Sequence, residues 1–345
     1  MADIAKRAGV SQATVSRVLN KDTRISAATS DRVMKAVSEF HYTKQAHSLK
    51  RVIAIVNTDL TSDFCIGIIR GVEAECIQRG YTLLIRRFEP QSRIFEVMSW
   101  LCENGIGGIV WHAMMRDEKI AAYLKDVGCP FVLVDSVLEH ISVSQVLSES
   151  RESSAKLANT LFDLDKGPVA YLKFQREAMP EITSDLRTLG FGAAAAARWG
   201  TGWETMCPRI ETGDLNQLAK AAFSLADSGV RCFFSHSSYI TAALVGEIEN
   251  SNRYRLDEFF FADFDVAAVH YRPGINSISA VQNTFEIGNA AMRILSEKQA
   301  LRRSKSGKAM AEQTLLLPPD FVAGGKLRNA APKGYPDSFW LRGIR

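Results

Sequence analysis

The sequence lacks the patterns that identify several common classes of protein. It contains no run of eighteen apolar residues, which excludes a membrane-spanning helix. Its first twenty residues are too polar for a secretory signal, so we expect a cytoplasmic protein without a membrane partner. No GxSxG, HExxH, P-loop or glycine-rich dinucleotide motif occurs, so the sequence indicates neither an enzyme nor a cofactor.

Paired cysteines are also lacking. None of the six cysteines forms a CxxC pair with another, which favours neither a zinc knuckle nor a redox motif. We therefore expect no metal site and scattered reduced thiols in the core. The six are Cys65, Cys76, Cys102, Cys129, Cys207 and Cys232.

The charge of the chain is unevenly distributed. With 345 residues, 46% hydrophobic and 23% charged, the chain has the composition of a globular protein with two or three domains. Residues 1–51 carry ten Lys and Arg against four Asp and Glu, a net charge of +6, whereas the whole chain carries only +4. A basic head on a near-neutral body suggests a nucleic-acid-binding module joined to a second unit. A solvated basic helix face is the alternative.

The basic head predicts a helix-turn-helix. Asp3–Ala8 has apolar residues at helical spacing, and Gly9 permits the turn that follows. A second short helix is predicted over Gln12–Leu19 and a third over about Ala27–Phe40. Two short helices joined by a glycine-containing turn form the helix-turn-helix arrangement.

The second helix presents groups that can read a major groove. Opposite its apolar side chains it would expose Gln12, Ala13, Ser16 and Arg17. Gln can bond adenine with two hydrogen bonds, Arg can do so with guanine, and Ala can contact the thymine methyl group.

The stretch AGVSQATVSRVLN, followed by ISAATSDRVMKAV, resembles the DNA-binding domain of the LacI/GalR family of bacterial transcriptional regulators. The resemblance implies that Gln12, Ala13 and Arg17 read bases. It also implies that further polar residues hold phosphates or set the docking angle. These are Ser11, Thr14, Ser16, Asn20, Ser26 and Thr29.

The segment after the head departs from that family. Its members usually have a Pro-Asn pair and a short helix whose Leu wedges into the minor groove. Here the pair is missing and the linker is several residues short, although Ala46 and Leu49 match the pattern Ala-x-x-Leu. Leu49 is therefore a candidate wedge, and its alternative is a contact with the body of the same subunit.

The rest of the chain alternates apolar strands with helices. The first strand is predicted at Val52–Val56 and the last at Glu258–Ala262, in two similar halves, which indicates two α/β lobes with parallel sheets. Ligands of such sheets bind beyond the carboxyl ends of the strands, here between the lobes. The resemblance extends to this region, including Arg187–Phe191 in the pattern Arg-x-x-Gly-aromatic. It implies a body similar to a periplasmic sugar-binding protein that senses a small effector.

By resemblance the effector contacts are Phe64, Asp135, Arg187 and Asp265. A guanidinium, two carboxylates and an aromatic ring suit a polyhydroxylated ligand. The alternative for Arg187 is an interlobe salt bridge with a carboxylate. His236 stands where the family usually has an Asn that bonds the sugar, so we expect His236 in the site and an effector other than the family's ordinary sugars.

These patterns define the expected domains. They are a helix-turn-helix domain at 1–41, a shortened hinge at 42–51, a two-lobed effector-binding and dimerisation domain at 52–325, and a basic tail at 326–345. The first lobe is expected at about 52–151 and 280–308, and the second at about 152–279 and 309–325.

The expected function is that of a homodimeric transcriptional regulator, by default a repressor. It would bind a pseudo-palindromic operator in double-stranded DNA, with an affinity that a small, sugar-like effector controls. The alternative is a cytoplasmic small-molecule-binding protein whose DNA binding is impaired or vestigial, which the shortened hinge favours.

Overall fold

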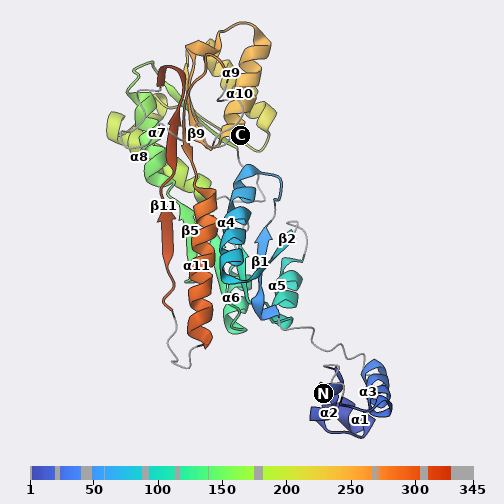
Figure 1. Ribbon diagram of the computed structural model, residues 1–345. Helices are drawn as coiled ribbons and strands as arrows, with labels where there is room; N and C mark the ends of the chain where they lie inside the picture. Colours follow the sequence, from blue (N-terminus) through green and yellow to red (C-terminus); the bar gives the residue numbers. More distant parts are fainter. Residues whose placement is uncertain are drawn as a thin grey trace.

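The structure is a computed structural model that describes residues 2–19, 24–39, 49–57, 59–87, 93–112, 117–138, 140–174, 182–265, 270, 272–303 and 310–327. The head consists of α1 (Ala2–Ala8), α2 (Gln12–Leu19) and α3 (Ala27–Glu39), in agreement with the sequence prediction. Gly9 has a φ of 64° between α1 and α2, a left-handed conformation that glycine adopts without strain. Figure 1 shows the head below the body.

The three helices of the head enclose a small apolar core. An ion pair between Arg7 and Glu39 (Nε to Oε2, 2.7 Å) also joins α1 to α3 on the surface. The buried core residues come from all three helices, so the head has its own hydrophobic centre. They are Ile4, Ala5, Ala8, Val15, Val18, Val33, Ala36 and Val37.

The first lobe is built on a parallel six-stranded sheet in the order β11-β5-β4-β3-β1-β2. Its strands are β1 (Val52–Asn57), β2 (Thr82–Arg87), β3 (Gly108–Trp111), β4 (Phe131–Val134), β5 (Gln145–Ser148) and β11 (Thr314–Leu317). Its helices are α4 (Asp63–Arg79), α5 (Ile94–Glu103), α6 (Glu118–Asp126) and α11 (Thr284–Arg303). The central strands are buried, as their continuous apolar sequences predict.

The second lobe has a six-stranded sheet in the order β12-β10-β9-β8-β6-β7, parallel except for β12. Its strands are β6 (Val169–Phe174), β7 (Arg209–Thr212), β8 (Cys232–Ser235), β9 (Phe260–Phe264), β10 (Asn276–Val281) and β12 (Asp320–Ala323). Its helices are α7 (Arg151–Phe162), α8 (Ile182–Trp199), α9 (Leu215–Asp227) and α10 (Ser238–Ser251). Short 3₁₀ turns are η1 (Leu49–Arg51), η2 (Trp203–Thr205), η3 (Leu256–Glu258) and η5 (Gly325–Leu327).

The two sheets have the same strand order, so β1, β3 and β4 of the first correspond to β6, β8 and β9 of the second. One predicted boundary is wrong. The segment 309–325 was expected wholly in the second lobe, but β11 pairs with β5 in the first sheet. Only β12, which follows Pro318 and Pro319, joins the second sheet. The apolar run at 314–317 thus covers the edge of the first sheet before the chain crosses (Figure 1).

A closely packed helix pair covers each sheet. In the first lobe α4 packs on α11, and a Cβ at Gly71 would lie 2.0 Å from the carbonyl oxygen of Phe285. In the second lobe α7 packs on α8, and a Cβ at Gly190 would lie 2.0 Å from the carbonyl oxygen of Arg151. Glycine at these two positions lets the helix backbones approach.

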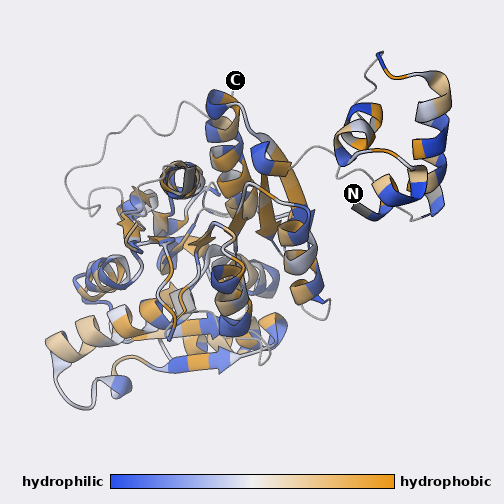
Figure 2. Cartoon of the chain, turned by 90° about the horizontal axis from the view of Figure 1, so that it is seen from below, coloured by the Kyte–Doolittle hydropathy of each residue, from blue (hydrophilic) through white to orange (hydrophobic). Residues whose placement is uncertain are grey.

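Hydrophobic residues concentrate on the strands and on the helix faces turned toward them, as the colouring of the ribbon in Figure 2 shows. Each sheet is covered on both faces, so each lobe is a three-layer α/β unit. Among the described residues, no helix is both long enough and apolar enough to cross a membrane.

Candidate functional site

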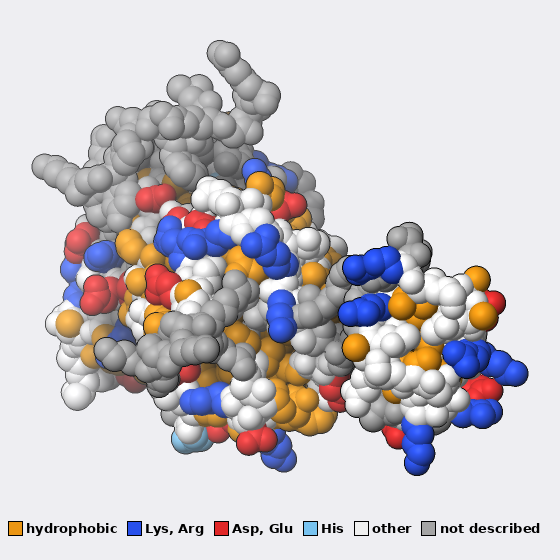
Figure 3. Space-filling model, turned by 60° about the horizontal axis from the view of Figure 1, so that its bottom comes forward, with side chains coloured by type: hydrophobic (Ala, Val, Ile, Leu, Met, Phe, Trp, Pro, Cys, Tyr) orange, Lys and Arg blue, Asp and Glu red, His pale blue; other side chains and the backbone are white. Residues whose placement is uncertain are grey.

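The head presents an exposed face on α2. Gln12, Ala13 and Arg17 are exposed there, while Val15 and Val18 of the same helix are buried in the head core. The head core therefore holds one face of the helix, while the other face is exposed to solvent. A helix that reads bases in a major groove needs such an exposed face. Lys and Arg side chains are distributed around the surface of the head in Figure 3.

Two pairs of hydroxyl groups lie at the amino ends of α2 and α3. The Thr14 amide donates to Ser11 Oγ at 3.1 Å, and the Thr29 amide donates to Ser26 Oγ at 3.4 Å. In each pair the two hydroxyl oxygens are 2.9 Å apart. Helix amino ends with hydroxyl groups favour anions, which fits the expected phosphate contacts. The Ser16 side chain and Asn20 lie outside the described residues.

Leu49 contacts the body of its own subunit. Its side chain packs, half-buried, on an apolar cluster of the first lobe, and its carbonyl accepts a hydrogen bond from the Gly107 amide at 2.9 Å. This is the alternative that the sequence left open. Because the linker is short, Leu49 lies only three residues before β1, where the body holds it. The structure thus supports the contact with the body, and the role of Leu49 as a wedge on DNA stays a prediction.

In the body, polar residues follow equivalent strands of the two sheets. His112 follows β3 and Asp135 follows β4 in the first lobe; His236 follows β8 and Asp265 follows β9 in the second. Both aspartates have positive φ, 48° and 67°. The backbone amide of each of these four residues donates a hydrogen bond of 2.9–3.0 Å to the neighbouring strand, one position beyond the end of its own strand. The acceptors are the carbonyls of Val56, Val146, Leu172 and Ala280.

The first-lobe half of the site is a buried polar cluster. His112 Nδ1 lies 3.0 Å from Asn57 Oδ1 and 4.0 Å from Cys65 Sγ, while its Nε2 lies 3.7 Å from Asp135 Oδ2. Burial opposes protonation, but Asp135 and Cys65 outweigh it and raise the pKa of His112 to about 9. His112 is therefore a cation at neutral pH. The Phe64 ring lies 6.1 Å from the His112 ring, between centroids.

The second-lobe half is organised by Arg187, which is 6% exposed. Its Nη1 donates to the carbonyl of His236 at 2.6 Å, and its Cζ lies 4.0 Å from the centroid of the Phe264 ring. The interlobe salt bridge, which was the alternative for Arg187, is not present: among the described carboxylates, none is paired with Arg187. Asp265 instead accepts hydrogen bonds from Gln282 Nε2 at 3.2 and 3.1 Å.

The three charged groups named from the sequence are near one another. Burial raises the pKa of Asp265; the charge of Arg187 opposes this rise, and the charge of Asp135 adds to it. The carboxylates of Asp135 and Asp265 are thus within electrostatic range of each other, and Arg187 is within range of Asp265. They lie at the carboxyl ends of both sheets, where α/β folds bind ligands.

His236 is 1% exposed and is held within the second lobe. Its Nδ1 accepts a hydrogen bond from the Phe174 amide at 3.4 Å, and its ring stands edge-on to Tyr239 with centroids 6.0 Å apart. Its backbone carbonyl is the acceptor that fixes Arg187. His236 therefore helps to hold Arg187 in position. Its contact with an effector stays a prediction.

Several buried polar atoms around these groups have no hydrogen-bond partner among the described residues. They include donors and acceptors: Asn57 Nδ2, Asp135 Oδ1, Arg187 Nε, Ser235 Oγ, Ser237 Oγ and Gln282 Oε1. Unpartnered buried polar atoms are costly, and a ligand that carries several hydroxyl groups would satisfy them. Among the described residues no cluster could hold a metal ion.

Asn57, His112 and Gln282 were missed in the sequence analysis. Each lies at the last position of a strand or just after it, and this place was the available signal. Because parallel strands end at the same edge, a polar residue that follows an apolar run is a candidate for the site.

Comparison with known proteins identifies the head. Residues 1–45 match the sequence model described as "Bacterial regulatory proteins, lacI family". The HTH-type transcriptional repressor PurR of Vibrio parahaemolyticus serotype O3:K6 (strain RIMD 2210633) is 31% identical over 207 residues, 56% of this chain and 60% of that protein. PurR of Vibrio campbellii (strain ATCC BAA-1116) is 25% identical over 86% of this chain and 90% of the relative.

Residues 1–45 therefore resemble the lacI family of bacterial regulatory proteins. The match with the first of these relatives spans less than two thirds of that relative's length. Solved structures of LacI-family fold extend the likeness to the body. A transcriptional regulator CelR–cellobiose complex has a TM-score of 0.65 at 21% identity, covering 93% of this chain and 98% of that one. A Lac repressor dimer bound to operator and the anti-inducer ONPF has a TM-score of 0.61 at 17% identity, covering 93% and 96%.

Proposed function

We propose that this protein is a LacI-family, sequence-specific DNA-binding transcriptional regulator whose operator affinity depends on a small effector between its lobes. The observation that carries the proposal is the exposed face of Gln12, Ala13 and Arg17 on a helix that its own core holds in place. The relatives are named as transcriptional repressors and regulators, and repression is the default direction. Acting on bacterial DNA, the protein would be cytoplasmic.

The effector would bind where the carboxyl ends of the two sheets meet. Arg187 and Asp265 from one lobe and Asp135 from the other would bond its polar groups, and Phe64 would cover an apolar face. One solved relative is described with cellobiose and another with ribose. We propose a sugar-like effector here, because the unpartnered atoms include both donors and acceptors. The proposed contacts of this chain also include two histidines: His112, which is a buried cation, and His236.

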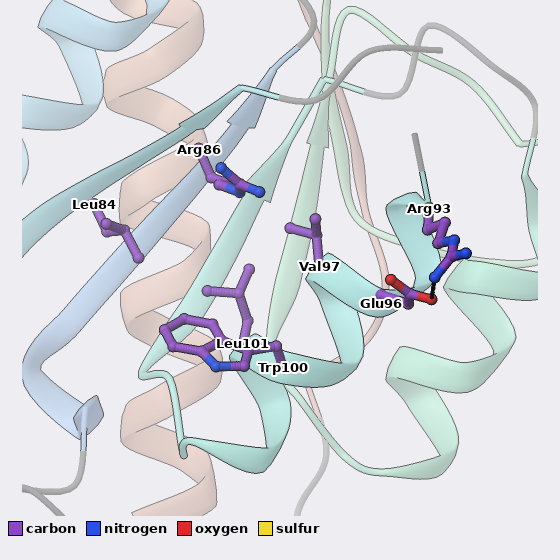
Figure 4. A pocket seen from close by; sticks show the side chains of 7 residues that line it. All are labelled: Leu84, Arg86, Arg93, Glu96, Val97, Trp100 and Leu101. Atoms are coloured by element: carbon purple, nitrogen blue, oxygen red, sulfur yellow. Dashed lines mark hydrogen bonds and ion pairs between the residues drawn. The ribbon is translucent and has the colours of Figure 1, made fainter. Parts of the chain in front are cut away.

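We further propose a homodimer, supported by an edge of the first lobe that no other described strand covers. The edge strand β2 and helix α5 form a hollow that includes Leu84, Val97 and Trp100 (Figure 4). Further exposed apolar side chains occur on the same elements, at Ile85 and Phe95. An open edge strand beside apolar groups favours a partner surface. Two heads would then read two half-sites of one operator.

The test is a selection of double-stranded DNA by the purified chain from a random-sequence pool. The proposal expects an enriched pseudo-palindrome, bound less tightly by Arg17→Ala by roughly 5- to 150-fold, the worth of one base contact at about 1–3 kcal/mol. Arg32→Ala is the matched control, since Arg32 is an exposed arginine on α3. Binding should also weaken steeply with salt.

Uniform retention of all sequences by the wild type would contradict the proposal. It would favour the small-molecule-binding protein with vestigial DNA binding. An equal loss in Arg17→Ala and Arg32→Ala would contradict the base-reading role of Arg17 and leave only general charge attraction.

A further inference from the structure

Cys65 differs from the other cysteines in the groups that surround it. Its sulfur lies 4.0 Å from His112 Nδ1 and 3.7 Å from Asn57 Oδ1. The five other cysteines belong to the apolar clusters of the two lobes or pack against them. The role of a small core side chain therefore describes those five, and the polar surroundings of Cys65 need another explanation.

Cys65, His112 and Asp135 have the arrangement of an activated nucleophile. His112 lies between the other two: its Nδ1 faces the sulfur, and its Nε2 lies 3.7 Å from Asp135 Oδ2. The three come from α4 and from the ends of β3 and β4, so the topology of the sheet brings them together. A thiol beside a histidine that a third polar group orients is the geometry that activates a cysteine in unrelated folds.

The place of Cys65 on α4 adds to this activation. Cys65 is the third residue of a 17-residue helix, and its amide donates to the Ser62 side chain at 3.3 Å. The positive end of a helix dipole favours a thiolate. Burial raises the pKa of Cys65, but its hydrogen bonds and the charge of His112 outweigh burial and lower it. Burial instead raises the pKa of Cys76, on the same helix, to about 11.

A buried donor group lies beside the thiol. Asn57 is fully buried, and its Oδ1 faces both the sulfur and the His112 ring. Its Nδ2 has no hydrogen-bond partner among the described residues, so a ligand oxygen would satisfy it. Phe64 and Asp135 next to the cluster are partly exposed, which places the thiol just below the surface at this end of the first lobe.

We propose that Cys65 binds a hydroxylated aldehyde, such as the open-chain form of a sugar, through a reversible covalent bond. This proposal rests on the effector site proposed above and names the reactive group of its ligand. The Cys65 thiolate attacks the carbonyl carbon, the S–C bond forms, and the π electrons of the C=O bond move to the oxygen. Protonated His112 then gives that oxygen the proton that it took from the thiol. The product is a hemithioacetal; no group leaves and no other reactant is needed.

The surrounding groups fit this reaction. Negative charge develops on the ligand oxygen during the attack, and the N–H groups of Asn57 and His112 are donors that stabilise such a charge. The S–C bond would fix one end of the ligand in the first lobe. Arg187 and Asp265 would bond its hydroxyl groups from the second lobe.

The first experiment adds glycolaldehyde, labelled with carbon-13 at its carbonyl, to the full-length reduced protein and follows the label by NMR. The wild type should give the signal of a carbon bonded to sulfur and to a hydroxyl group, and Cys65→Ser should lack this signal. The adduct should dissociate less readily than the glutathione adduct by about tenfold, the worth of one net hydrogen bond. Cys76→Ser is the matched control, because Cys76 is buried on the same helix within an apolar cluster. It should give the wild-type signal.

The second experiment measures the thiol itself by alkylation with N-ethylmaleimide. Trypsin cleaves at Arg70, so peptide 52–70 contains Cys65 and peptide 71–79 contains Cys76. At about ten times its dissociation constant, glycolaldehyde should slow the alkylation of peptide 52–70 by about tenfold, by mass action. Dialysis should restore the rate. Ethylene glycol, which has hydroxyl groups but no carbonyl, should give no protection.

Two results would overturn the proposal. One is the same labelled-carbon spectrum for the wild type and Cys65→Ser. The other is equal protection by glycolaldehyde and ethylene glycol, which would indicate a site that binds hydroxyl groups without a covalent bond and would leave the proposed effector site standing. Neither experiment uses DNA, so a failure of the operator selection would contradict the proposed function alone.

Discussion

The two lobes place the same residue types at equivalent strand ends but use them differently. A histidine follows β3 and β8, and an aspartate follows β4 and β9, with matching backbone hydrogen bonds. In the first lobe His112 and Asp135 are directed at each other. In the second lobe Arg187 is the cation, His236 contributes its backbone carbonyl, and Asp265 is bonded by Gln282.

This difference shows how one topology can hold two kinds of binding surface. The first lobe compensates the charge of Asp135 internally, because protonated His112 lies beside it. The second lobe holds Arg187 by a carbonyl and the Phe264 ring, so its guanidinium remains available to a ligand. We therefore expect the second lobe to contribute more to effector affinity than the first.

The largest expected effect concerns the helix pairs that the two lobes share. Gly71→Ala and Gly190→Ala should each destabilise the protein by about 3 kcal/mol, because the new methyl group would overlap a backbone carbonyl. Denaturant unfolding measures the change. Gly246→Ala on α10 is the control, since no atom lies within 4 Å of its added Cβ. It should stabilise by up to about 1 kcal/mol. Equal behaviour of all three variants would contradict the close packing.

The next effect separates the two halves of the site. Arg187→Lys keeps the charge but loses the planar fork, and should weaken effector binding by about 2 kcal/mol, roughly thirtyfold. Asp135→Asn should weaken it less, because Asn tolerates the positive φ and His112 remains nearby. Calorimetry measures both, with whichever compound of a sugar panel raises the melting temperature of the wild type. A larger loss in Asp135→Asn would reverse the proposed order of the lobes.

Much of the fold followed from local sequence pattern. The bounds of α2 were predicted to the residue, because Gln12–Leu19 is amphipathic. Strands β5, β7, β10, β11 and β12 were missed. β5 has a Gln and a Ser in four residues, β7 is the half-exposed edge strand RIET, and β11 follows a long helix with no strand partner nearby in sequence. These strands are defined by pairing with segments that are distant in the sequence, which a local sequence pattern does not indicate.

The candidate site was predicted only in part, for a similar reason. Resemblance indicated Asp135, Arg187 and Asp265, and the structure brings them into one electrostatic neighbourhood. The His112 cluster was missed because its partners, Asn57 and Asp135, lie on other strands. Sequence spacing within one segment carries no information about such neighbours.

A smaller effect concerns the charge pair of the first lobe. The pKa of His112, about 9, lies above its ordinary value of 6.5, so the resulting stability is fully present below pH 6.5 and is lost as the pH rises through about 9. Asp135→Asn should lower this pKa. The difference in unfolding free energy between wild type and variant should be about 1–2 kcal/mol near pH 6 and should vanish near pH 10.

Two measurements check this prediction. Denaturant unfolding from pH 6 to pH 10 gives the difference in stability, and NMR titration of the His112 ring gives its pKa. Asp126→Asn, on the exposed surface of α6, is the control and should leave the His112 titration unchanged. A His112 ring that titrates near 6.5 in the wild type would remove the proposed asymmetry between the lobes.

The most direct test of the account asks whether a compound bound between the lobes changes the affinity of the head for DNA. The affinity of the protein for its selected operator is measured with and without a compound that binds between the lobes, in the wild type and in Asp265→Asn. The account predicts that the compound changes operator affinity at least tenfold in the wild type, and that the same concentration has little effect in the variant. An operator affinity that is unchanged when the wild-type cleft is saturated would contradict it.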